Sequence, residues 1–185
     1  MVQFDFDERL AMSSGIAKSI PIQDILMKNV PGILRIEQAD SLSDRNGTDW
    51  WLYHRAGHCL SVDAKVRQID YSRRGQDDLA LEVWSVKEQG ITGWTLRQDK
   101  RTDYILWYWI DTGRWCLVPF GMLSKVFQER LDDWSNEYKH AEQHTPWGDG
   151  SYTSECLFVP RKAVWAAIYR RFSGIPEVND ASPAN

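Results

Sequence analysis

Cysteine is scarce in this sequence, and the three residues present, Cys59, Cys116 and Cys156, are widely spaced and form no C-x-x-C pair. An odd number of isolated cysteines indicates neither a disulfide framework nor a cysteine-based zinc site. Long apolar runs are also missing: the longest, residues 104–110, is far too short to cross a bilayer. The first ten residues, MVQFDFDERL, are acidic where a signal peptide would be basic and then apolar. We therefore expect a soluble protein of a reducing cytoplasm, with no membrane contact.

The sequence also lacks an excess of positive charge. Its 22 lysine and arginine residues are outnumbered by 26 aspartate and glutamate residues, and the formal net charge of −4 argues against gripping nucleic acid by bulk charge alone. Basic residues do cluster locally, for example at Arg97, Lys100 and Arg101, and such a cluster is either a solvated face or part of a groove. Walker, G-x-G-x-x-G and G-x-S-x-G motifs are absent from the sequence, so nucleoside triphosphate binding and serine hydrolysis have no support.

Apolar residues, tryptophan among them, are well represented. Hydrophobic residues make up 43% of the chain and charged residues 26%, which is typical of a globular protein with one sizeable core. The ten tryptophans are interpreted first as core fillers, and some as candidates to line a cleft. We predict a single domain over residues 1–172, with a helical N-terminal cap over residues 1–32 and a disordered tail over residues 173–185.

Strands dominate the middle of the chain. Five segments rich in β-branched and aromatic residues are separated by Gly, Asp or Arg clusters, and they cover residues 48–54, 59–67, 79–86, 103–110 and 114–118. Turns at residues 55–57 and 111–113 predict that the first two and the last two of these strands form hairpins. A further short strand is expected at residues 33–39, followed by a turn-rich loop at residues 40–49.

Helices are expected on both sides of these strands, at residues 5–14, 21–30 and 119–143 and after Pro160. In the third of them, apolar residues recur at spacings of three and four. His140 and His144, four residues apart at its C-terminal end, would share one helix face. A short strand at residues 154–159 precedes the last helix. The C-terminal part of the domain, residues 119–172, is therefore predicted to be mainly helical.

The stretch GTDWWLYHRAGHCLSVDAKVR, residues 47–67, carries the candidate chemistry. Alternate residues of a strand share a face, so Asp63 and Lys65 lie together on the polar face of the second strand. The hairpin brings Asp49 near the same end of the sheet. Two neighbouring carboxylates repel each other, and a hard cation such as Mg²⁺ or Mn²⁺ bound between them relieves that repulsion. Lys65 would orient a water or stabilise charge on an attacked phosphate, which suits phosphodiester hydrolysis.

Residues 40–120 resemble the PD-(D/E)xK nuclease superfamily of restriction-endonuclease-like folds, with Asp49 in the place of the first acid and Asp63-Ala64-Lys65 as the D-x-K element. Asp49 follows threonine where many members have proline. The resemblance implies an α/β fold with a central mixed β-sheet of about five strands flanked by helices. It implies that Asp49 and Asp63 bind the metal and that Lys65 serves the attacking water.

The same resemblance offers two further acids. Glu82 alternates with Leu81 and Val83 along its strand, so it is either a supporting acid of the site or the partner of a nearby arginine. Glu8 is the counterpart of an acid that some members supply from an N-terminal helix. Of these two residues, Glu82 joins Asp49, Asp63 and Lys65 in the candidate catalytic set.

The expected function is a Mg²⁺- or Mn²⁺-dependent nuclease acting on DNA, from a bacterium or a phage-infected cell. A small acidic enzyme of this kind would rely on a homodimer, a protein partner or a local groove to hold its substrate. The alternative is the same fold without catalysis, as a binding or inhibitory protein that docks on a nucleic-acid-processing complex. A third interpretation is an interaction domain in which Asp63 and Lys65 only solvate an exposed sheet face.

Overall fold

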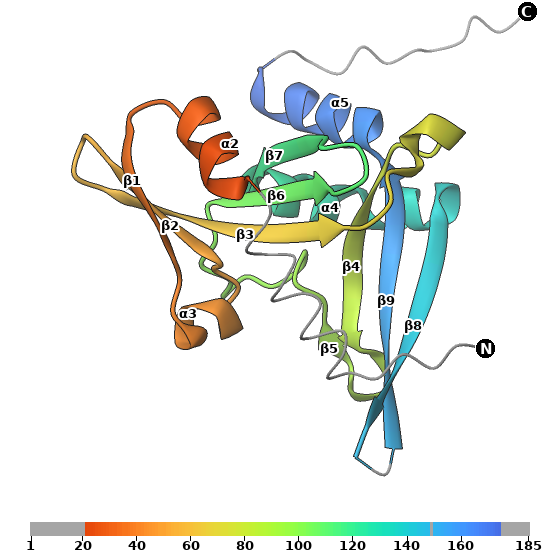
Figure 1. The fold of residues 1–185 in the computed structure, drawn as a ribbon. Helices are drawn as coiled ribbons and strands as arrows, with labels where there is room; N and C mark the ends of the chain where they lie inside the picture. The colour runs from red at the N-terminus through yellow and green to blue at the C-terminus, as the bar shows by residue number, and fades with distance from the viewer. Residues whose placement is uncertain (1–20, 149, 175–185) are drawn as a thin grey trace, which may run out of the picture.

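The computed structural model describes residues 21–148 and 150–174, and it has an α/β architecture with two β-sheets (Figure 1). The predicted helix at residues 5–14, Glu8 and most of the predicted tail lie outside the described residues. The predicted helix at residues 21–30 is confirmed as α2 (Ile22–Asn29). Among the described residues, no helix has the length and apolar character needed to cross a membrane.

The larger sheet has five strands in the order β1-β2-β3-β6-β7. Its strands are β1 (Ile33–Gln38), β2 (Trp50–His54), β3 (Cys59–Arg67), β6 (Tyr104–Trp109) and β7 (Trp115–Pro119). The pairing of β3 with β6 is parallel and the other pairings are antiparallel, so the predicted five-stranded mixed sheet is present. Both predicted hairpins, β2–β3 and β6–β7, are confirmed.

The prediction that residues 79–86 form a strand of the five-stranded sheet is wrong. The segment at residues 79–86 forms β4 (Asp78–Val86), which belongs to a second, four-stranded sheet with the order β5-β4-β9-β8. The fifth strand of the five-stranded sheet is instead the short β1, which lies at one edge. β4 pairs with β9 (Gly150–Pro160) along most of its length, and that partner lies more than sixty residues further along the chain. β4 and the two-residue β5 (Ile91–Thr92) thus lie within the connection between the parallel strands β3 and β6.

The helix predicted over residues 119–143 is too long at its C-terminus. The observed α4 (Phe120–Glu137) ends where Tyr138 adopts an extended backbone, and the chain continues as β8 (Lys139–Trp147). Beyond Tyr138 the next positions on the apolar helix face are Ala141 and Glu142, so a further turn would bury little. Pairing with β9 satisfies the backbone instead, and His140 and His144 therefore lie on a strand.

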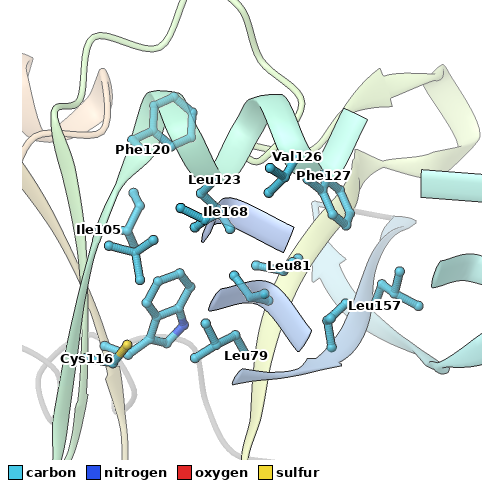
Figure 2. Close-up of a cluster of buried hydrophobic side chains, with 14 of the residues drawn as sticks. Leu79, Leu81, Ile105, Cys116, Phe120, Leu123, Val126, Phe127, Leu157 and Ile168 are labelled. Carbon is cyan, nitrogen blue, oxygen red and sulfur yellow. The ribbon is translucent and has the colours of Figure 1, made fainter. Parts of the chain in front are cut away.

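The core forms on both faces of the five-stranded sheet. On one face, α2 packs its buried residues Ile22 and Leu26 against Val62 of β3 and Leu106 of β6. On the other face, the four-stranded sheet, α4 and α5 (Arg161–Phe172) enclose the larger cluster. Figure 2 shows side chains of α4 above Leu81 of β4 and Leu157 of β9. β3 therefore has one side chain row under α2 and the other facing the second sheet.

Candidate functional site

The row of β3 that faces away from α2 contains Asp63 and Lys65, as the strand alternation predicted. Val62 belongs to the apolar cluster beneath α2, whereas the Asp63 side chain is only 5% exposed on the other face. Lys65 Nζ lies 2.9 Å from Asp63 Oδ2, and its side chain is 26% exposed. The acid and the amine thus form an ion pair at the edge of the interior, with the amine nearer to solvent.

Asp49 meets this strand through the β2–β3 hairpin. Its backbone N–H donates to the carbonyl of Val62 at 2.9 Å, and its carboxylate Oδ2 accepts a hydrogen bond from the Ala64 N–H at 2.5 Å. The Asp49 carboxyl is therefore fixed to the backbone between Asp63 and Lys65. The structure brings together all three residues of the predicted triad.

A second lysine, Lys100, enters the site from the segment between β5 and β6. Its Nζ lies 2.8 Å from Asp63 Oδ2 and donates to the carbonyl of Gly47 at 3.3 Å. The Lys100 side chain is only 5% exposed, so the interpretation of the Arg97–Arg101 cluster as a solvated face is wrong for this residue. Asp63 Oδ2 therefore accepts a hydrogen bond from Lys100 and forms ion pairs with both ammonium groups.

Gly47 lacks the Cβ that would fill the space taken by Lys100. Its φ is +85°, in the region that favours glycine, and a Cβ at this position would collide with Lys100 Nζ. Its carbonyl also accepts a hydrogen bond of 2.6 Å from Thr102 Oγ1. The turn that leads into Asp49 is thus attached to the segment that carries Lys100.

These residues surround an open pocket of about 310 Å³, which we call the Asp63 pocket. Four carboxylates and three cationic groups line it: Asp44, Asp49, Asp63, Glu82, Lys65, Arg97 and Lys100. The predicted supporting acid Glu82 is therefore part of the same pocket as the triad. Asp44 was not predicted, because residues 40–49 were expected to be a loop and instead contain the short helix α3 (Ser41–Arg45).

Glu82 holds a tryptophan in the pocket wall. Its Oε2 accepts hydrogen bonds from the backbone N–H of Trp94 at 2.9 Å and from Ser85 Oγ at 3.1 Å. Within the described residues Glu82 forms no ion pair with an arginine, so that alternative is not observed. The Trp94 ring centroid lies 5.1 Å from Lys65 Nζ and 6.0 Å from Lys100 Nζ, within the range of cation–π attraction.

The electrostatics of the site follow from its burial. Burial raises the pKa of Asp49 to about 7, the negative charge of Asp63 contributes in the same direction, and the hydrogen bond from Ala64 opposes the shift. Burial lowers the pKa of Lys100, while the Asp63 carboxylate opposes that change. Near neutral pH the Asp49 carboxyl thus gains or loses a proton readily, so any cation that binds this oxygen competes with a proton.

The pocket contains carboxyl oxygens, the ligand type that hard divalent cations prefer. Among the described residues, no set of three or more His, Cys, Asp or Glu side chains is arranged to hold a metal ion. Mg²⁺ needs fewer protein ligands than that, because it commonly keeps several waters and binds one or two carboxylates together with substrate phosphates. Asp49 and Asp63 place two carboxyl groups in the pocket.

His140, His144 and Asp103 lie outside the Asp63 pocket. His140 Nδ1 is 2.5 Å from Glu155 Oε1, and His144 Nδ1 is 2.9 Å from Thr153 Oγ1, so both histidines contact β9 and neither lines the Asp63 pocket. Asp103 directly precedes β6, and its Oδ2 accepts from the Ser61 N–H at 2.7 Å. These residues hold strands together outside the pocket.

Comparison of the chain with models of protein families, with curated protein sequences and with solved structures finds no match.

Proposed function

We propose that this chain is a metal-dependent nuclease of the PD-(D/E)xK type that hydrolyses phosphodiester bonds, with DNA as the expected substrate. The observation that supports the proposal is the convergence of Asp49, Asp63 and Lys65 in one open pocket. Asp49 and Asp63 are 14 residues apart in the sequence, yet the carboxyl of one is bound to the backbone beside the other. An arrangement that only solvated a sheet face would leave Asp63 exposed, whereas it is almost completely buried.

In this reaction Asp49 and Asp63 would hold Mg²⁺ or Mn²⁺. The bound cation supplies Lewis-acid polarisation of the phosphate and lowers the pKa of a coordinated water. Lys65, the more exposed of the two lysines, would orient the attacking water or stabilise the charge that develops on the phosphate. Glu82 would position Trp94 in the pocket wall, which makes it a positioning residue.

The test combines Mn²⁺ calorimetry with cleavage of mixed DNA and RNA substrates. We expect the wild type to bind Mn²⁺ and to cleave, and Asp63→Asn to lose both properties. Lys65→Gln should keep Mn²⁺ binding and lose cleavage by a factor of about 10² or more. Asp132→Asn, an exposed acid of α4 outside the pocket, is the matched control and should behave as wild type. Folded wild-type protein that binds no Mn²⁺ would contradict the proposal.

The alternative is a catalytically silent protein of the same fold that binds or inhibits a nucleic-acid-processing complex. The observation that favours it is the double ion pair of Asp63, because Lys65 and Lys100 neutralise this carboxylate without a metal. Such a pocket would not bind Mn²⁺, so adding the ion should leave the melting temperature of the protein unchanged. For the nuclease, saturating Mn²⁺ should raise the melting temperature, since a ligand that binds only the folded state stabilises it.

A further inference from the structure

A second pocket opens beside the Asp63 pocket, and we call it the Ile91 groove. It has a volume of about 640 Å³ and is lined by β5 and the segment after it, with Ile91, Thr92, Leu96 and Gln98 in its wall. Ser85 and Arg97 line both pockets, so the two share a wall. The proposed hydrolysis uses only the Asp63 pocket, and the groove therefore has space for a part of the substrate beyond the reacting phosphate.

The wall of the groove combines apolar and hydrogen-bonding groups. Ile91 is 46% exposed, a large share for an aliphatic side chain, and Leu96 packs against the larger core cluster. Thr92 and Gln98 add a hydroxyl and an amide. A nucleoside presents the complementary surfaces, because its base has apolar faces and hydrogen-bonding edges, and pockets of this size bind small molecules of that kind.

Arg97 stands where the groove meets the Asp63 pocket. Its guanidinium forms a two-point ion pair with Asp99, with Nε 3.0 Å from Oδ1 and Nη2 2.7 Å from Oδ2. The Arg97 and Asp99 side chains are 46% and 71% exposed, so the ion pair is solvated and contributes little to the stability of the folded state. A guanidinium binds phosphate oxygens with the same two-point geometry. A phosphate can therefore take the place of the Asp99 carboxylate on Arg97 with little loss of interaction free energy.

Resting on the proposed nuclease function, we propose that the Ile91 groove binds the nucleoside next to the scissile phosphate and that Arg97 contacts the backbone phosphate between the two pockets. The substrate is then a single strand, or an unpaired end or flap of a duplex. A duplex has about twice the charge per length of one strand, whereas the residues that line the groove include one cationic side chain, Arg97, and one acid, Asp99. The net charge of −4 also disfavours a duplex.

The test measures binding without cleavage. Fluorescently labelled oligothymidylate and a blunt duplex are titrated with the full chain in Ca²⁺, and binding is followed by anisotropy at several salt concentrations. We expect the single strand to bind at least about tenfold more tightly than the duplex. Arg97→Ala should weaken strand binding about fivefold and reduce the salt slope by about 0.7, the value for one phosphate contact on a single strand.

Two further variants separate the parts of the groove. Asp99→Asn frees Arg97, so it should bind the strand as tightly as wild type or more tightly. Ile91→Ala should weaken binding about threefold without changing the salt slope, because it removes apolar contact and no charge. Arg73→Ala, an exposed arginine outside both pockets, is the control and should leave both quantities unchanged.

The outcomes distinguish this inference from the function on which it rests. Equal or tighter duplex binding, or an Arg97→Ala variant that matches Arg73→Ala, would overturn the inference even if the protein cleaves DNA in Mn²⁺. Strand binding that depends on Arg97 and Ile91, in a protein that never cleaves, would support the groove and contradict the nuclease.

Discussion

The charge of Asp49 is the most direct quantity to test, because asparagine at this position keeps the shape and the acceptor for the Ala64 N–H but cannot ionise. The Asp49 pKa of about 7 exceeds its ordinary value of 3.8 by about three units, and each unit corresponds to about 1.4 kcal/mol. The folded state therefore binds a proton that the unfolded state releases near pH 4. Binding of this proton therefore adds its full contribution to the free energy of unfolding below about pH 4, and that contribution is lost as the pH rises through about 7.

We expect Asp49→Asn to have the same free energy of unfolding as wild type near pH 4. Its advantage should then grow with pH and level off above about pH 7 at up to about 4 kcal/mol. Urea unfolding followed by tryptophan fluorescence, in EDTA from pH 4 to pH 8, measures this difference. Asp132→Asn, an exposed acid, serves as the control with no such slope. A difference between Asp49→Asn and wild type that stays constant across this range would refute the reasoning.

Three further changes test other contacts. Lys100→Met removes one of the two amines that pair with the buried Asp63 carboxylate, so thermal unfolding should show that the free energy of unfolding falls by about 2 kcal/mol. Gly93→Ala brings a Cβ against the backbone carbonyl of Glu82, and the melting temperature should fall by an amount that corresponds to about 2 kcal/mol or more. Asp70→Ala removes a buried acid that Arg114 contacts at 2.9 Å, and urea unfolding should show a loss of about 2 to 4 kcal/mol. A wild-type-like value in any of these measurements would contradict the contact it tests.

The local parts of the fold could be predicted from the sequence. Alternation along residues 59–67 correctly separated Val62 from Asp63 and Lys65, because a strand has only two faces. The turn residues at 111–113 likewise identified the β6–β7 hairpin, and the four-residue spacings identified most of α4. These patterns involve residues only a few positions apart in the sequence, so they can be read from the sequence alone.

The non-local parts could not be predicted in the same way. β8 is polar on both faces, since most of its side chains are exposed, and its partner β9 alone defines it as a strand. The assignment of β4 to the second sheet depends on the same partner. Lys100 lies in a charged segment with no apolar neighbours that would indicate burial, and its contact with Asp63 spans 37 residues. Long-range contacts of this kind leave no periodicity in the sequence.

The parallel pairing of β3 with β6 has a consequence for how the molecule reaches its native state. Asp63 and Lys100 lie at opposite ends of the intervening connection, and part of that connection, β4, finds its partner only when β9 has been synthesised. Contacts between such distant residues form slowly, because the entropy of closing the loop opposes them. We therefore expect the pocket to assemble last in folding. A chain that stopped before β9 would keep both acids of the β2–β3 hairpin and still lack the strand that holds the opposite wall in place.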